Sequence, residues 1–209
     1  MSHSRNNEIE DCTAAAYYHA RQVWTSQIST EITEPDSNVL ALYEASTGYN
    51  PADPSTDQGG IEQNVLSYLV NQGAPVGNGG RDKLLGYVET DIRNLNDIRR
   101  SIYECGVCYI GFDIPACLDT DDPPPVWDYN PKGDNSDTGG HAVILCGYDI
   151  DSFTLISWGQ KYKMTNRFFT NFADEAYALL DNSWIAGTGK TPLGMTPHDL
   201  WLQMLAIRG

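Results

Sequence analysis

The chain has 209 residues, a length that suits one domain or two lobes around a shared cleft. Hydrophobic residues make up 41% and charged residues 20%, as in an ordinary globular protein. The net charge of −15 disfavours a nucleic-acid partner, because phosphate binding needs clustered Lys and Arg. No apolar run is long enough to predict a membrane span, and the N-terminal residues lack the apolar segment of a secretion signal. We therefore expect neither membrane binding nor secretion by a signal peptide.

The first part of the chain, to about residue 80, reads as helical. Apolar residues recur at helical spacing over 12–27, with Asp11 as a plausible N-cap. A short helix within 37–49 is expected to stop at Gly48, and another is expected within 59–73. These three elements predict a mainly helical lobe.

The remainder, about 81–209, mixes strands with helices. In chain order we predict a strand in 83–90, a helix in 91–105, a strand in 107–114, a long Asp-, Pro- and Gly-rich loop over 115–140, a hairpin of strands in 141–150 and 153–159, a short helix and a strand in 164–180, and a helix in 196–208. This order favours an α+β protein, with residues 1–209 forming a single two-lobed domain.

Cys12 is the most informative of the five cysteines. An odd number of cysteines without a secretion signal argues against a disulfide framework. At the start of a helix, the backbone N–H groups and the helix dipole favour a thiolate, whereas Glu8, Glu10 and Asp11 oppose it. The alternative interpretation is a small buried hydrophobic residue, which is the usual environment of a free cysteine.

A thiol nucleophile needs a base, and His141 is the best of the four histidines. It follows Gly140 and opens an apolar strand, where its ring can stand at a strand end. His19 lies two turns along the Cys12 helix, His3 lies near the N-terminus, and His198 lies in the first turn of a predicted surface helix. None of these three is expected to reach the thiol.

Three motifs together resemble the papain-like cysteine peptidases: "DCTAAA" at Cys12, "GGHAV" at His141 and "SWG" ending at Gly159. The resemblance implies a papain-like fold, with a helical lobe, a β-rich lobe and a cleft between them. It also implies that Cys12 is the nucleophile, that His141 is the base, and that Asn6 and the Cys12 backbone N–H hold the oxyanion. By the same resemblance, Trp158 and Gly140 line the cleft.

Two positions depart from the papain-like pattern. Ile156 stands where the family has the Asn that orients the histidine, and an aliphatic side chain cannot do this. Because the predicted hairpin is about one residue short, Ser157 is a weak candidate for the orienting group. Asn6 replaces the family's Gln, which is a milder change because Asn donates the same kind of hydrogen bond.

A narrower resemblance links "YEASTGY", "WGQKYKMT" and "FADEAYALL" to papain-fold proteins of tailed bacteriophages. It implies two alternatives. One is a phage-type cysteine peptidase or amidase-type hydrolase that acts on protein or peptide. The other is a catalytically impaired papain-fold protein that binds other virion proteins. Either would be located in the host cytoplasm or in the virion.

No cofactor or metal is expected. Cys105 and Cys108 form a CxxC pair, but at a helix end rather than at a helix start, so structural cysteines are the better interpretation. The Asp-rich loop lacks the spacing of a calcium loop. It reads as a solvated lid or interaction surface, with Trp127 and Tyr129 as exposed aromatic candidates for partner contact.

Overall fold

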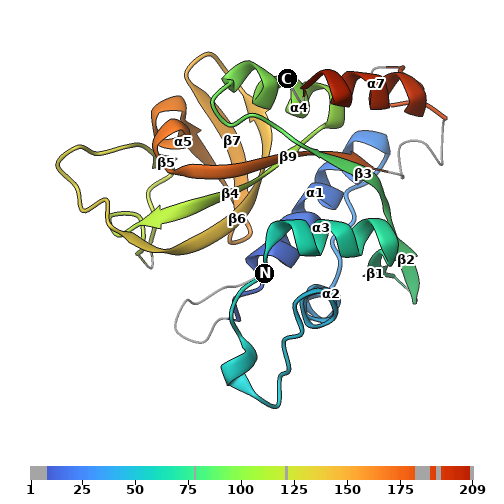
Figure 1. Ribbon diagram of the computed structural model, residues 1–209, viewed down its shortest axis with the longest axis horizontal. Helices are drawn as coiled ribbons and strands as arrows, with labels where there is room; N and C mark the ends of the chain where they lie inside the picture. The colour runs from blue at the N-terminus through green and yellow to red at the C-terminus, as the bar shows by residue number, and fades with distance from the viewer. Residues whose placement is uncertain (1–8, 78, 121, 182–188, 192–193, 208–209) are drawn as a thin grey trace.

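A seven-stranded sheet, in the order β3-β9-β4-β6-β7-β8-β5, dominates one half of the computed structural model (Figure 1). The structure describes residues 9–77, 79–120, 122–181, 189–191 and 194–207. The strands are β1 (Ala74–Val76), β2 (Gly80–Asp82), β3 (Leu84–Glu89), β4 (Cys108–Pro115), β5 (Val126–Trp127), β6 (Asp137–Tyr148), β7 (Ser152–Ser157), β8 (Gln160–Thr165) and β9 (Ala173–Asp181). Within the sheet, β5 pairs with β8 in parallel and the other neighbours are antiparallel.

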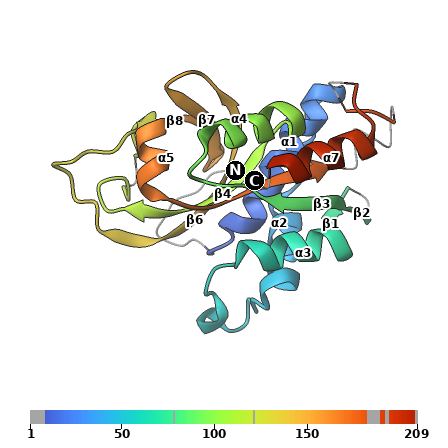
Figure 2. The same cartoon turned by 45° about the horizontal axis from the view of Figure 1, so that its top comes forward.

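The helices are α1 (Cys12–Ile28), α2 (Asp36–Thr47), α3 (Glu62–Asn71), α4 (Leu95–Cys105), α5 (Asn166–Phe172) and α7 (Pro197–Ile207), with a short 3-10 helix, η2 (Pro54–Thr56). Helices α1, α2 and α3 gather on one side of the sheet, while α4 and α5 lie against its other parts (Figures 1 and 2). No helix in the described part of the chain combines the length and apolar character needed to cross a membrane.

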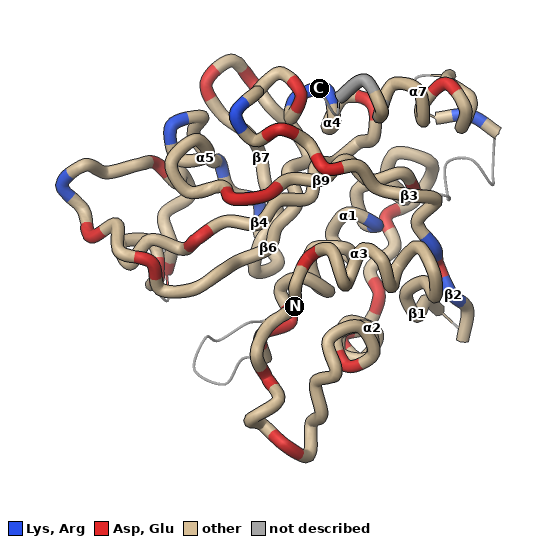
Figure 3. Tube along the Cα trace, in the orientation of Figure 1, with Lys and Arg blue, Asp and Glu red and all other residues tan. Residues whose placement is uncertain are grey.

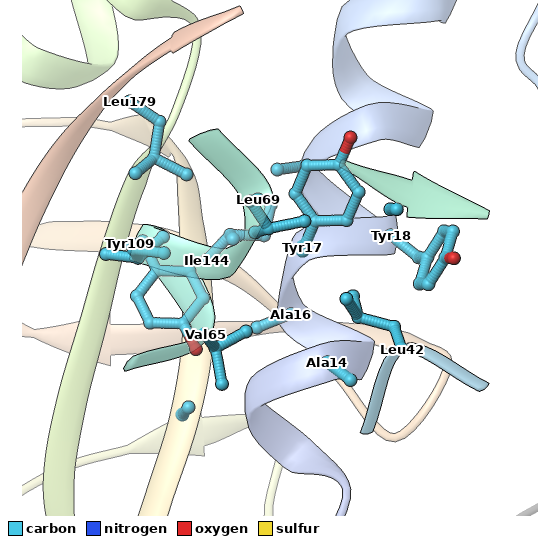
Figure 4. Close-up of a cluster of buried hydrophobic side chains, with 14 of the residues drawn as sticks. Ala14, Ala16, Tyr17, Tyr18, Leu42, Val65, Leu69, Tyr109, Ile144 and Leu179 are labelled. Atoms are coloured by element: carbon cyan, nitrogen blue, oxygen red, sulfur yellow. The ribbon is translucent and has the colours of Figure 1, made fainter. Parts of the chain in front are cut away.

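Helix α1 lies in the middle of a core cluster and is covered on nearly every side (Figure 4). The helical spacing of apolar residues over 12–27 predicts one buried face, whereas the structure buries most of the helix surface. The buried residues of the helix are Thr13, Ala14, Ala16, Tyr17, Tyr18, His19, Ala20, Trp24 and Thr25. Several are small, which lets α2, α3 and the sheet approach the helix closely. The start of the helix is thus held by packing from both the helices and the sheet.

Hydrogen bonds fix one end of α1 to the sheet and the other end to α4. The Tyr109 hydroxyl on β4 donates to the carbonyl of Thr13 at 3.0 Å, and the Trp24 indole donates to the carbonyl of Cys105 at 2.8 Å. Gly60, just before α3, approaches so closely that an added Cβ would lie 2.4 Å from the Thr13 hydroxyl. The first turn of α1 consequently has little freedom to move relative to β4 or α3.

Most predicted elements appear near their expected positions because their signals are local. Gly48 ends α2 in the left-handed conformation, with φ +83°. Helix α4 begins later than predicted, at Leu95, because the Asn94 side chain caps it by accepting from the Asn96 N–H. The short strands β1, β2 and β5 and the strand β8 were not predicted, since each depends on its pairing partner rather than on its own pattern.

Candidate active site

The Cys12 thiol lies where the first turn of α1 meets the start of β6. Cys12 is the first residue of the helix, and the backbone N–H of Ala142 lies close enough to its sulfur to lower the pKa of the thiol. Ala142 directly follows His141, so the fold brings the predicted nucleophile next to the segment of the predicted base. Asp11 occupies the N-cap position, but its side chain makes no capping hydrogen bond.

The Cys12 thiol is held in its protonated form. Burial is the main cause and raises the pKa of the thiol to about 12, and the carboxyl groups of Glu62, Glu10 and Asp11 raise it further. The Ala142 N–H lowers the pKa, but by less than burial raises it. Desolvation therefore outweighs the thiolate stabilisation that the helix start predicted. Ionisation of this thiol needs a proton acceptor within reach.

His141 is packed between aromatic rings, and its imidazole contacts the Ser157 hydroxyl. Its ring stacks on Trp158 at 4.9 Å between centroids with an interplanar angle of 16°, and the ring of Phe112 meets it edge-on at 5.6 Å. Its Nε2 lies 2.8 Å from the Ser157 hydroxyl. Because Nε2 contacts the Ser157 hydroxyl, Nδ1 is the ring nitrogen that can exchange a proton with a thiol.

Ser157, and not Ile156, faces the histidine. Ile156 pairs with Ile144 across β6 and β7 and packs on the α1 side of the sheet. Successive side chains of a strand point to opposite faces, so Ser157 lies on the side of His141. Ser157 is 3% exposed, which protects its hydrogen bond from water. This contact makes Ser157, rather than Ile156, the candidate for the orienting residue.

Replacing Ser157 with alanine is expected to slow alkylation of Cys12 by about 2- to 10-fold at neutral pH, which corresponds to the loss of one neutral hydrogen bond. Ser152→Ala is the matched control, because Ser152 is also buried on β7 but bonds to Asp149 instead. The rate is measured with a small electrophile and mass spectrometry. Equal rates for the two variants would remove the orienting role from Ser157.

The long loop between β4 and β6 contributes a buried residue to this site. Trp127 is 0% exposed, so the prediction of an exposed aromatic contact residue was wrong at this position. Its ring lies 5.6 Å from Trp158 and 5.0 Å from Tyr162. Tyr129 is partly buried, against Phe172 at 5.9 Å between ring centroids. Apolar aromatic side chains are withdrawn from an otherwise polar loop because the sheet offers them an aromatic cluster.

A pair of carboxyl groups close to Cys12 was not predicted from the sequence. Glu62, on the first turn of α3, hydrogen-bonds to Glu175 on β9, and Asp174 lies beside them. A Cβ added at Gly111 would lie 2.9 Å from Glu62 Oε1, 2.9 Å from Glu175 Cγ and 3.1 Å from Asp174 Oδ1. The lack of a side chain at Gly111 therefore makes room for this carboxyl cluster, which no linear motif signals. Figure 3 shows acidic positions at the start of α3 and along β9.

Burial, the hydrogen bond to Glu175 and the nearby charges raise the pKa of Glu62 to about 8. Burial is the largest of these causes. Burial and neighbouring carboxylates also raise the pKa of Asp174. Within the described residues, neither Glu62 nor Glu175 forms an ion pair. A shared proton relieves the repulsion between the two carboxyl groups.

The remaining predicted site residues have different positions. Gly140 is exposed and pairs with Asp113, with no atom within 4 Å of an added Cβ, so the backbone just before His141 is open. Asn6 lies outside the described residues, and so does His3. His19 is buried and contacts Gln22 at 2.9 Å, away from the first turn of α1.

Cys105 and Cys108 are free and fully buried, and burial raises the pKa of both thiols. Such thiols pack as small apolar groups. Cys117, in the long loop, is exposed. Among the described residues no group of three or more His, Cys, Asp or Glu side chains is arranged to hold a metal ion.

No protein-family model matches the chain, and no curated protein matches it in sequence. Solved structures do. Xylellain, a cysteine protease from Xylella fastidiosa, matches with a TM-score of 0.67 and 17% identity over 87% of this chain and 83% of that one. The Carica candamarcensis cysteine protease CMS1MS2, solved in complex with E-64, matches with a TM-score of 0.59 and 15% identity, over 87% of this chain and 93% of that one. Digestive procathepsin L 3 of Tenebrio molitor matches with a TM-score of 0.56 and 14% identity, over 82% of this chain and 64% of that one. The predicted α+β, papain-like fold is confirmed.

Proposed function

We propose that the protein is a papain-like cysteine peptidase or amidase-type hydrolase that acts on protein or peptide. The observation that carries the proposal is the meeting of the two predicted segments. The Ala142 N–H reaches the Cys12 sulfur, while Ser157 and Trp158 hold the neighbouring His141 ring. A thiol at a helix start beside an oriented imidazole is the arrangement that nucleophilic acyl transfer requires.

In the proposed reaction, His141 takes the thiol proton and the Cys12 sulfur attacks the carbonyl carbon of an amide. The negative charge that forms on the carbonyl oxygen is held by the backbone N–H of Cys12, with Asn6 as a proposed second donor. The C–N bond then breaks, His141 gives its proton to the leaving amine, and a thioester remains on Cys12. Water, deprotonated by His141, hydrolyses the thioester and regenerates the thiol.

A second candidate is a papain-fold virion protein that binds other virion proteins and has weak or no catalysis. The observation that favours it is the opposition to the thiolate, because burial and three nearby carboxyl groups all raise the pKa of the Cys12 thiol. The host cytoplasm or a phage particle is the proposed location in both cases, on the resemblance of the sequence motifs to phage papain-fold proteins.

Hydrolysis of a mixed fluorogenic peptide library, with wild-type protein and Cys12→Ala, separates the two candidates. We expect turnover that disappears in Cys12→Ala, and a thioester on Cys12 that mass spectrometry detects after acid quenching. Cys117→Ser is the matched control, because it removes an exposed thiol that is not part of the proposed Cys-His pair. Turnover that survives in Cys12→Ala would contradict the proposal. Absence of both turnover and trapped thioester would favour the binding protein.

A further inference from the structure

Trp127 contacts both rings that enclose the His141 imidazole. Trp158 stacks on His141, and the centroid of Trp127 lies 5.6 Å from that of Trp158. Phe112 meets His141 edge-on, and it lies 5.8 Å from Trp127. Trp127 is fully buried behind these two rings and does not itself form a ring contact with the histidine. It is therefore placed to act on His141 only through its neighbours.

The loop fixes Trp127 on both sides. The Lys163 N–H donates to the carbonyl of Pro125 at 2.9 Å, and Trp127 pairs with Met164 where β5 runs parallel to β8. The next residue, Asp128, accepts from the Thr165 hydroxyl at 2.7 Å, and it also accepts from the Arg167 guanidinium. The rest of the loop extends away from the sheet (Figure 1). Trp127 is thus the point at which this loop is anchored behind the site.

The backbone of Trp158 depends on such anchoring. Its φ of +48° is the one positive value among non-glycine residues in the described chain. A bulky residue keeps this conformation only where its surroundings impose it. The packed rings of Trp127 and Tyr162, 5.6 Å and 6.1 Å from Trp158 between centroids, supply those surroundings. Loss of the Trp127 ring leaves Trp158 free to relax and to release the stacked imidazole.

We propose that Trp127 is a positioning residue for His141 and acts through Trp158 and Phe112. The inference rests on the proposed function in one respect, which is that His141 serves as the base for Cys12. It assigns part of the long loop to the catalytic machinery rather than to partner contact. It also predicts that the loop affects the site without touching the substrate.

Trp127→Leu and Trp127→Phe test the proposal. The Trp127 indole N–H has no hydrogen-bond acceptor among the described residues, so Trp127→Phe loses ring area but no hydrogen bond. We expect Trp127→Leu to slow alkylation of Cys12 by about 10-fold, because displacement of a catalytic group lowers the rate steeply. Trp127→Phe is expected to stay within about 3-fold of wild type, since it preserves an aromatic contact. Each rate is measured from about pH 5 to about pH 9, at temperatures where the variant is folded.

Phe169→Leu is the matched control. Phe169 is buried in the same core cluster, but its ring contacts Phe153 and not the rings around His141. It should lower the melting temperature while leaving the alkylation profile unchanged. If alkylation depends on His141 and Trp127→Leu still behaves like this control, Trp127 is merely structural and the proposal is overturned.

An NMR measurement separates this proposal from the proposed function. Stacking on Trp158 shifts the ring-proton resonances of His141 upfield, and Trp127→Leu should return them toward ordinary values. If these resonances move but alkylation does not depend on His141, the positioning role holds and the proposed function fails. If they do not move, the positioning role fails whatever the activity.

Discussion

Alkylation of Cys12 by a peptide-based electrophile is expected to fall by about 100-fold at neutral pH when His141 is replaced by alanine, within the range for loss of a general base. The reason is the state of the thiol. With the pKa of Cys12 raised to about 12, a thiol without a proton acceptor is ionised in only about one molecule in 10⁵ at neutral pH. Nearly all fast labelling must therefore pass through proton transfer to the imidazole.

The matched control for this experiment is His198→Ala, since His198 is exposed on α7, far from Cys12 in the chain. In the His198→Ala variant, the electrophile should alkylate Cys12 at the wild-type rate. The exposed Cys117 reacts with any electrophile, so Cys117→Ser serves as the background for all variants. The proposed role of His141 fails if His141→Ala labels Cys12 as fast as the wild-type protein does.

Glu62→Gln is expected to remove a pH dependence from both stability and reactivity. The pKa of Glu62 is raised from its ordinary value of 4.5 to about 8 in the folded protein. Between these two values the folded chain binds more protons than the unfolded chain, so the free energy of unfolding falls as pH rises. The stabilising contribution is present at low pH and is lost as the pH passes the folded pKa. Glutamine keeps a hydrogen-bond donor beside Glu175 and cannot ionise.

Ionised Glu62 also opposes formation of the Cys12 thiolate, since its charge raises the pKa of that thiol. At about pH 9, Glu62→Gln should therefore melt at a higher temperature than the wild type and label Cys12 about 3-fold faster or more. At about pH 5 the two proteins should label alike, because Glu62 is then protonated. Thermal unfolding and alkylation rates across pH measure both effects.

Glu44→Gln is a suitable control, as Glu44 is a partly buried carboxylate near the end of α2 and not part of the carboxyl cluster. It should leave both pH dependences unchanged. Identical pH profiles for the wild type and Glu62→Gln would show that the carboxyl cluster has no influence on the thiol. A stability change with no change in labelling would confine the cluster to a structural role.

The sequence alone determined the elements whose signals are local. Gly48 after a helical pattern set the end of α2, and the apolar run after His141 predicted most of β6, although the strand begins earlier, at Asp137, inside the predicted loop. Motif order was enough to predict the papain-like fold, and it selected Cys12 and His141 as candidate partners, which stays a prediction. The element and fold predictions succeed because helix ends, strand patterns and short motifs depend on neighbouring residues.

Only the tertiary structure decided what each candidate side chain touches. The sequence left Ile156 and Ser157 as alternatives, and the pairing of Ile156 with Ile144 decided that Ser157 faces the histidine. A tryptophan in an Asp-rich loop read as exposed, but β5 pairing buries Trp127 behind the site.

The charge state of Cys12 could likewise not be predicted from the sequence. A helix start predicted a favoured thiolate, whereas burial and Glu62, brought in on α3, favour the thiol. Desolvation and Coulomb energies depend on distances between groups that the chain brings together only on folding. The sequence by itself therefore proposed which residues form the site, and the fold determined the orientation of the described ones, their neighbours and the burial that favours the protonated thiol.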